Sequence, residues 1–461
     1  MNLLRFSVGN FRSIKDIVTL DLAPKLGDAT ALTDPVKEIT EPVVAIFGPN
    51  GSGKSNLLEA LQFAHEAIVR SATSWRVPDD YPTQPHFPFK LSEETVSQPS
   101  FFEFDFTINE TRYLYGFTYG RDGVVEEWLS YVPKQRWSKG FIRNRTETPE
   151  IDWNNSYITK TLQKELGKVD KRELILSVAL RDEHPLLQKI AYALVSSLSF
   201  LPLGDFAQNE RIQQATSLIR KKHFDLDEIS LLMKAADTGI ESVSLNEEKI
   251  PPEILERLYK FLKAMKELDD ESNEEILSND EAEKVIYNLV FTHGGKINST
   301  LDLSEESAGT LAWLSTAPTL LQTLREGSIL IADELDSSLH QKLLEMIIKG
   351  FTDPSINQHG AQLIFTIHNT NIIEHMDDLS LDTKSIWFME KNQNGESSLF
   401  SLVDFPNHAD ANYERRYLSG RYGALPFLSP STLRGLVSTQ GSETAHESNS
   451  ESPKLIQRSQ T

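Results

Sequence analysis

The segment Glu41–Asn56 constrains the fold of this chain most, because it joins an apolar run, a glycine-rich turn and a helix-forming stretch. Val43–Phe47 predicts a short buried strand, and helix-forming residues run from 56 to 67. Between them lies Gly-Pro-Asn-Gly-Ser-Gly-Lys-Ser, residues 48–55. In this context the loop turns backbone N–H groups toward phosphate oxygens, and the helix points its positive end at the same charge. The alternative, a chance Lys-Ser pair after an ordinary turn, is disfavoured by the strand–loop–helix order.

The loop predicts a nucleoside triphosphate site that also holds Mg²⁺. We expect Lys54 to reach the β- and γ-phosphates and the Ser55 hydroxyl to hold the metal ion. No base-reading motif is evident, so the residues alone leave ATP and GTP open. The predicted nucleotide contacts of this segment are Gly48, Pro49, Asn50, Gly51, Ser52, Gly53, Lys54, Ser55 and Asn56.

A second motif with related chemistry lies far downstream, where the apolar run Ser328–Ala332 predicts a strand that ends in Asp333 and Glu334. A carboxylate at a strand end beside a phosphate loop can support Mg²⁺, and its neighbour can polarise the attacking water. We therefore assign Asp333 to the metal and Glu334 to catalysis. A solvated strand end is the alternative, and the upstream phosphate loop disfavours it.

Three further features are candidates for the same site. His368 follows the predicted strand 362–366 and is expected to hydrogen-bond the γ-phosphate, the alternative being a histidine satisfied by loop carbonyls. His340 is expected at a helix start or a subunit contact. Ser304–Thr310 precedes a predicted helix and can receive an anion, although an ordinary N-cap is the better interpretation when this segment is taken alone.

Composition excludes several classes of protein. The 461 residues contain no cysteine, so disulfides, zinc thiolate sites and cysteine nucleophiles are ruled out. The formal net charge of −21 argues against a broad nucleic-acid footprint. No apolar run approaches membrane-spanning length and the N-terminus lacks a signal-peptide core, so we expect a cytoplasmic protein without a membrane partner. One local basic patch is interpreted as a solvated hairpin or loop in preference to a nucleic-acid groove: Lys134, Arg136, Lys139, Arg143 and Arg145.

The pattern of elements predicts an α/β fold in four parts. Residues 1–155 carry the phosphate loop and a lobe of antiparallel strands, and residues 156–289 have helical periodicity that we interpret as an insertion. Residues 290–428 resume the α/β pattern, and 429–461 are predicted to be a disordered tail. The helices expected in the insertion are Arg172–Leu180, Leu186–Leu198, Asn209–Lys221, Asp227–Ala236, Pro252–Leu268 and Asn279–Asn288.

Taken in order, these motifs resemble the ATP-binding-cassette ATPases of the RecF and structural-maintenance-of-chromosomes (SMC) kind. They are most similar to the stand-alone bacterial ATPases of anti-phage and abortive-infection loci, RloA-like proteins included. The resemblance covers residues 1–427 and rests on six segments: Asn10–Ser13, Phe47–Asn56, Ser304–Thr310, Asp333–His340, Thr366–Asn369 and Tyr417–Pro426.

The resemblance implies that two ATP molecules, each with Mg²⁺, lie between two head-to-tail protomers of a homodimer or higher oligomer. Ser307 and Gly309 would approach the γ-phosphate from the partner, and Leu335–Leu339 would lie across the seam. The glutamine-bearing loop of the family is placed at Gln84 or Gln98. The segment Glu305–Thr310 departs from the transporter-like Ser-Gly-Gly-Gln, which leaves the contacting serine open.

The function implied is an ATPase switch of an anti-phage system with slow turnover. Long coiled-coil arms and a fused nuclease are not predicted, so the switch would control a separate effector, a nuclease or another toxin. The acidic surface suits a protein partner better than generic DNA. The alternatives are a RecF-like repair ATPase that binds DNA directly and a nucleotide-dependent scaffold, and Glu334 argues against the scaffold.

Overall fold

The computed structural model describes residues 1–461 except 28, 33, 76–84, 167, 202–206, 221–223, 250–284, 296, 338, 407–411, 427–428, 432–433 and 435–461. It divides into two units, Met1–Ala424 and Leu425–Thr461. Every helix and strand discussed below belongs to the first unit. Most of the predicted tail lies outside the described residues.

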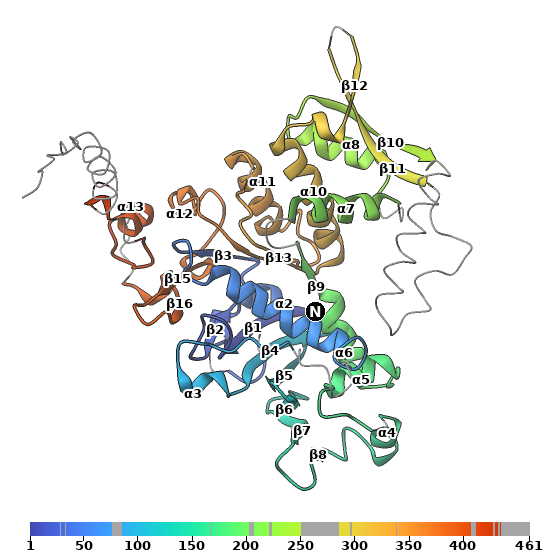
Figure 1. Cartoon of the computed structure of the whole chain (residues 1–461), viewed down its shortest axis with the longest axis vertical. Coiled ribbons are helices and arrows are strands. Elements are labelled where there is room, and N and C mark those ends of the chain that lie inside the picture. Colours follow the sequence, from blue (N-terminus) through green and yellow to red (C-terminus); the bar gives the residue numbers. More distant parts are fainter. Residues whose placement is uncertain are drawn as a thin grey trace, which may run out of the picture. The chain divides into compact units, whose positions relative to one another are not determined.

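The phosphate loop follows an inner strand of a six-stranded sheet, which we call the nucleotide sheet (Figure 1). Its strand order is β16-β15-β3-β14-β13-β9, with β16 antiparallel and the other five parallel. Every residue of β3, β13 and β14 is buried, which explains why these strands read as continuous apolar runs. The strands are β3 (Val43–Phe47), β9 (Leu198–Phe200), β13 (Ile329–Ala332), β14 (Gln362–Thr366), β15 (Ile386–Lys391) and β16 (Ser397–Ser401).

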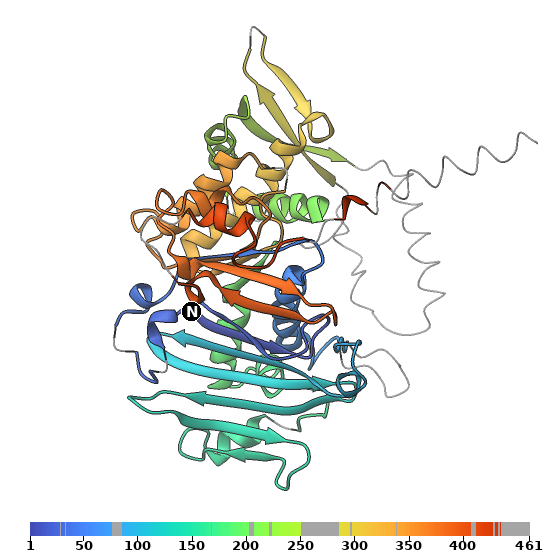
Figure 2. The same ribbon diagram turned by 90° about the vertical axis from the view of Figure 1, so that its left-hand side faces the viewer.

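A seven-stranded antiparallel sheet forms the β lobe, as Figure 2 shows. Its order is β2-β1-β4-β5-β6-β7-β8, and short turns at residues 109–110 and 121–122 join β4 to β5 and β5 to β6. The expected α/β class, with a mixed sheet and an antiparallel lobe, is therefore confirmed. The strands are β1 (Asn2–Gly9), β2 (Val18–Asp21), β4 (Ser100–Ile108), β5 (Thr111–Gly120), β6 (Gly123–Tyr131), β7 (Ser138–Asn144) and β8 (Ile151–Trp153).

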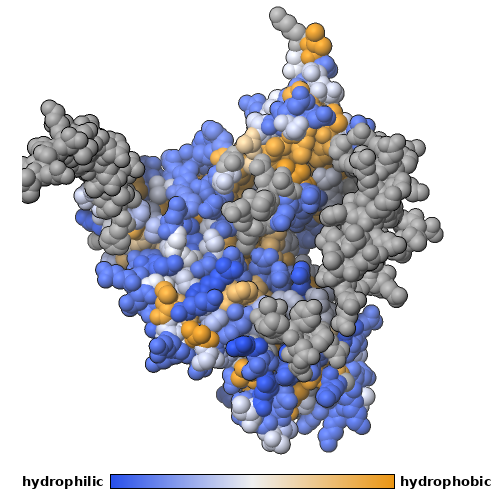
Figure 3. All heavy atoms as spheres, in the orientation of Figure 1, coloured by the Kyte–Doolittle hydropathy of each residue, from blue (hydrophilic) through white to orange (hydrophobic). Residues whose placement is uncertain are grey.

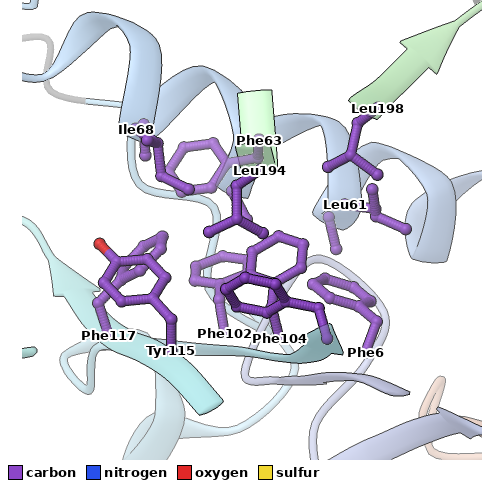
Figure 4. Close-up of a cluster of buried hydrophobic side chains, with 14 of the residues drawn as sticks. Phe6, Leu61, Phe63, Ile68, Phe102, Phe104, Tyr115, Phe117, Leu194 and Leu198 are labelled. Carbon is purple, nitrogen blue, oxygen red and sulfur yellow. The ribbon is translucent and has the colours of Figure 1, made fainter. Parts of the chain in front are cut away.

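Helix α2 (Lys54–Arg70), which follows the phosphate loop, packs against the β lobe. Phe63 of α2 stacks on Phe102 of β4 with ring centroids 5.1 Å apart, and Figure 4 shows Leu194 of α6 (Leu187–Ser197) in the same cluster. Burying such side chains stabilises the fold by about 1.5–3 kcal/mol each. The core therefore fixes the helix that begins at Lys54.

The predicted basic patch is part of the β lobe, and three of its five charged side chains have local partners: Lys139, Arg143 and Arg145. Arg143 is only 1% exposed and donates to the carbonyls of Asp170 and Glu173 at 3.0 and 2.7 Å. Lys139 forms an ion pair with Asp152 on the neighbouring strand. These contacts favour the structural interpretation of the patch over a nucleic-acid groove.

A buried carboxylate ties the β lobe to helix α5 (Ile175–Arg181). Glu127 on β6 is fully buried and accepts hydrogen bonds from the backbone N–H groups of Ile175 and Leu176 at 2.8 and 3.3 Å. The Tyr115 hydroxyl donates to it at 2.9 Å. Burial raises the pKa of Glu127 to about 7, against the opposing effects of Arg143 and these donors.

This shift makes stability depend on pH. The pKa of Glu127 in the folded protein lies above the ordinary value of 4.5. The protonated side chain therefore contributes its full stabilising free energy below pH 4.5, and this stabilisation is lost as the pH rises through 7. We expect the unfolding free energy of the parental chain, relative to Glu127→Gln, to fall by up to ~3 kcal/mol between pH 4.5 and 8. Urea unfolding at both pH values measures it. The exposed neighbour Glu126→Gln is the control, and an equal pH dependence in Glu127→Gln and the parental chain would contradict the assignment.

The segment predicted as a helical insertion contains strands as well as helices. Helices α4 (Lys160–Glu165), α5 and α6 are followed by β9, which joins the nucleotide sheet. Next come α7 (Ala207–Arg220), α8 (Leu226–Ala235) and a three-stranded antiparallel sheet. The strands of this sheet are β10 (Ile240–Lys249), β11 (Val285–His293) and β12 (Ser299–Asp302).

One expected helix is wrong in the part that the structure describes. Residues 285–288 of Asn279–Asn288 belong to β11, where Val285, Ile286 and Tyr287 pair with β10. Branched and aromatic side chains suit a strand once a partner strand is present. Pro252–Leu268 lies outside the described residues, and the domain boundaries at 155, 289 and 428 stay predictions.

The remaining helices lie outside the inserted segment. The closing segment of the unit packs against β15, where Tyr417 stacks on Phe388 at 5.0 Å and its hydroxyl donates to the Ala424 carbonyl at 2.9 Å. The longer helices are α10 (Ala308–Glu326) and α11 (Gln341–Thr352). The short ones are α1 (Val36–Ile39), α3 (Glu93–Val96), α12 (Asn371–Glu374) and α13 (Tyr413–Leu418).

Candidate nucleotide-binding and catalytic site

The phosphate loop runs from the end of β3 to the start of α2, and two of its glycines are required by space. A Cβ on Gly48 would lie 2.2 Å from the Met389 carbonyl oxygen, and one on Gly53 would lie 2.4 Å from Ser397 Oγ. Gly53 also has φ +108°, which L side chains rarely adopt. The glycines therefore permit both the turn and the close approach of β15 and β16.

Lys54 folds back over the loop that precedes it. Its Nζ donates to the carbonyls of Gly48 and Pro49 at 2.7 and 3.3 Å, and the residue is only 6% exposed. Burial lowers the pKa of Lys54, and the carboxylates of Asp333, Glu334 and Asp336 oppose that effect. A buried ammonium group held at the loop can bind phosphate without first being ordered.

Sheet topology brings the Asp-Glu segment to the phosphate loop. β14 lies between β3 and β13, and all three are parallel, so their carboxyl ends meet at one edge of the sheet. The charges of Asp333 and Glu334 favour the protonated form of Lys54 and so raise its pKa, which agrees with this arrangement. The two motifs, remote in the sequence, therefore form one site.

A single threonine on β14 contacts both residues of the Asp-Glu segment. The Thr366 hydroxyl donates to Asp333 Oδ1 and accepts the backbone N–H of Glu334 at 2.7 Å. Glu334 has φ +47°, an uncommon conformation for glutamate, and the Leu335 N–H to the Thr366 carbonyl at 3.2 Å helps to hold it. We call Asp333–Asp336 the carboxylate turn.

His368 lies beside Glu334 as the sequence predicts. Its Nε2 is 3.5 Å from Glu334 Oε1, and both side chains are exposed. Asp336 orders this end of β14, because its Oδ2 accepts the backbone N–H groups of His368 and Asn369 at 3.1 and 3.0 Å. The histidine and glutamate therefore face the same space.

Three polar side chains brace the loop from the other side, in a structural role that the sequence analysis did not assign to them. Ser397 Oγ donates to the Ser52 carbonyl at 2.6 Å and lies 2.7 Å from Ser13 Oγ. Asn56 also donates to Ser13 Oγ, at 2.6 Å. The segment Asn10–Ser13 was a signal for this role, whereas Ser397 had none in the sequence.

An open groove of about 530 Å³ adjoins these braces. The Arg12 guanidinium lies over the Phe87 ring at 5.4 Å and forms an ion pair with Glu59 at 2.8 Å. A cation stacked on an aromatic ring gives a flat, positively charged wall. Other residues along the groove are Ser13, Asn56, Phe89, Lys90, Leu91 and Lys391.

The residues predicted to act from a partner lie at the start of another helix. Ser307 is the N-cap of α10, where its Oγ accepts the Thr310 N–H at 3.1 Å, and Gly309 lies in the first turn. Ser307 is exposed, so it can be presented to a second chain. His340 caps α11 by accepting the Lys342 N–H, which confirms its helix-start interpretation.

The position of the family's glutamine-bearing loop, at Gln84 or Gln98, stays a prediction. Gln84 and Ser338, the latter in the predicted seam segment, lie outside the described residues. Gln98 is exposed, and its carbonyl accepts a hydrogen bond from the Asn10 side chain at 2.8 Å.

The residues fit a magnesium nucleoside triphosphate. Among the described residues, Ser52 Oγ is a buried hydroxyl without a hydrogen-bond partner, and it lies in the loop beside Lys54. Ser55 and Asp333 offer the hydroxyl and carboxylate oxygens that Mg²⁺ prefers. Among the described residues, no group of three or more histidine, aspartate or glutamate side chains could hold a metal ion.

The role of Thr366 can be tested directly. Thr366→Val keeps the shape of the side chain but removes both hydroxyl bonds, so we expect ATP hydrolysis to fall by about 10- to 100-fold from misplacement of the carboxylate turn. Steady-state phosphate release measures this effect. Thr366→Ser retains the hydroxyl and should stay within a few-fold of the parental rate; equal losses in both variants would show that the hydroxyl is not the cause.

The parallel sheet, the glycine loop and the carboxylate turn define a P-loop ATPase of the α/β class. Residues 43–374 match the model of a family described as "AAA domain, putative AbiEii toxin, Type IV TA system". The chain belongs to this family, which confirms the resemblance to AAA-type ATPases of abortive-infection loci. A search of curated proteins returns no match. No described helix is long and apolar enough to cross a membrane.

Solved structures of SMC heads also align with the chain. The SMC head domain from Thermotoga maritima is 14% identical, with a TM-score of 0.39, over 87% of this chain and 99% of that one. An SMC head bound to the C-winged helix domain of ScpA is 13% identical, with a TM-score of 0.37, over 87% and 97% of the two chains.

Proposed function

We propose that this protein hydrolyses ATP in a head-to-tail dimer and acts as the switch of an anti-phage defence system that controls a separate effector. The observation that carries the ATPase part is the approach of Lys54 to the carboxylate turn, because it unites phosphate binding and water activation. The described chain offers one such site. The description of the family, which names a putative AbiEii toxin, supports the defence part.

The chemistry is phosphoryl transfer to water. Lys54 and the loop N–H groups hold the β- and γ-phosphates, and the nucleoside extends into the groove beside Arg12 and Phe87. Glu334 orients the attacking water and accepts its proton, and His368 donates to the γ-phosphate. Bound Mg²⁺, held by Ser55 and Asp333, would neutralise charge on the phosphates.

The dimer can be tested with two complementary defects. Lys54→Ala removes the phosphate lysine of one chain, and Ser307→Arg blocks the α10 start of the other. Each variant alone should not hydrolyse ATP. A mixture of the two should recover slow hydrolysis, because one of the two composite sites in a mixed dimer combines an intact Lys54 with an intact Ser307. A mixture as inactive as its components would contradict the head-to-tail arrangement.

The switch role needs a partner. The face in Figure 3 is mostly hydrophilic. The net charge of the chain is −21, which suits a protein effector better than DNA. Purification of the tagged protein from its native cells, with and without ATP, should recover the product of a neighbouring gene. Recovery of DNA alone, in a salt-sensitive manner, would favour a RecF-like role instead.

A further inference from the structure

One basic side chain from the inserted segment reaches the carboxylate turn. Arg211 lies in the first turns of α7, and its Nη2 donates to the Asp333 carbonyl oxygen at 3.4 Å. Burial lowers the pKa of Arg211, while the charges of Asp333 and Glu334 oppose this effect. No sequence motif pointed to this residue, and the chemistry proposed above does not use it.

Helix α7 packs along α10, the helix whose N-cap is Ser307 (Figure 1). Helix α8 is joined to α10 as well, because Trp313 Nε1 donates to the Leu232 carbonyl at 2.8 Å and Arg325 forms an ion pair with Glu228 at 2.5 Å. A movement of α7 therefore carries α10 with it, since packed helices shift as units.

The start of α10 is also fixed to the three-stranded sheet. Glu306, whose side chain is 4% exposed, contacts His293 of β11 at 2.7 Å, and the next residue is Ser307. Ser230 of α8 accepts the Val243 N–H of β10 at 2.8 Å. We call α7, α8, α10 and β10–β12 the signature module, because these contacts hold them together around the segment that carries Ser307.

We propose that Arg211 is a positioning residue that links the carboxylate turn to the signature module, so that nucleotide bound at Lys54 sets how the same chain presents Ser307 to its partner. This inference rests on the proposed function and adds the route of coupling within one protomer. The guanidinium already lies beside the carboxylate turn, where a bound triphosphate changes the local charge. Its planar fork can hold a carbonyl and a second acceptor at once, which a lysine cannot match in geometry.

The test compares Arg211→Gln, Arg211→Lys and the control Glu210→Gln, which changes the exposed neighbour on the same helix. Binding of a fluorescent, non-hydrolysable ATP analogue reports the site of one chain. Light scattering with and without the analogue reports dimer formation, and phosphate release reports hydrolysis. We expect Arg211→Gln to bind the analogue within a few-fold of the parental chain, yet to lose nucleotide-dependent dimer formation and about 100-fold in hydrolysis.

Arg211→Lys should recover part of both losses because it keeps the charge, and Glu210→Gln should behave as the parental chain. Dimer formation by Arg211→Gln at the parental analogue concentration would overturn the inference while leaving the ATPase proposal intact. If Arg211→Gln fails to bind the analogue, Arg211 serves binding and the coupling role is overturned. A parental chain that neither binds the analogue nor hydrolyses ATP would overturn the proposed function, and this inference with it.

Discussion

Replacing Glu334 with glutamine should abolish turnover while leaving ATP bound. The Glu334 carboxylate after β13 is the group that we propose to accept the proton of the attacking water, and an amide cannot accept it. We expect the single-turnover rate of hydrolysis to fall by about 10²- to 10⁴-fold, the usual contribution of a general base. Binding of ATP should be unchanged or tighter, because one negative charge near the phosphates is removed. The variant should therefore accumulate as the ATP-bound dimer.

Quench-flow measurement of phosphate formation, with light scattering for the dimer, gives both quantities. Glu374→Gln is a suitable control, because Glu374 is an exposed carboxylate at the end of α12. Hydrolysis by Glu334→Gln at the parental rate would show that another group activates the water. A loss of ATP binding together with activity would instead assign Glu334 a structural role in the turn at φ +47°.

The sequence was sufficient for the central strands and for the two motifs that end them. Buried parallel strands read as apolar runs, and polar residues directly after such runs must meet at one sheet edge. This reasoning predicted that Lys54, Asp333 and His368 share a site. It needed no knowledge of side-chain conformation, because strand ends alone determine the meeting point.

The supporting residues could not be predicted, because each depends on a pairing remote in sequence. Ser397 braces the loop through Ser13, which is 384 positions away, and neither residue has a motif that names the other. Thr366 was predicted only as the last residue of a strand, yet its hydroxyl bonds both the Asp333 carboxylate and the Glu334 backbone N–H. Arg211 was read as part of an ordinary helix, since nothing local shows that α7 passes the carboxylate turn.

The strands of the inserted segment were missed for a related reason. Residues 285–288 have apolar spacing that suits a helix as well as a strand, and pairing with β10 decides between them. Local propensity is weak where such pairing is available. Ser307 is a different case. Its N-cap role is seen within one chain, but the contact predicted for it is with the nucleotide of a second chain.

Lys54→Ala should remove nucleotide binding and every effect that depends on it. The buried ammonium group sits on the Gly48 carbonyl inside the loop, so its loss takes away the positive charge nearest the phosphates. A charge-assisted hydrogen bond contributes about 1.5–3 kcal/mol, and lysine makes more than one to a triphosphate, so we expect affinity for ATP to fall by at least about 100-fold. Isothermal titration with a non-hydrolysable analogue measures this loss directly. Because burial penalises the charged lysine, the free variant should be as stable as the parental chain. Lys349→Ala, at an exposed position on α11, is the matched control; binding by Lys54→Ala equal to that control would mean that the glycine loop does not hold the phosphates.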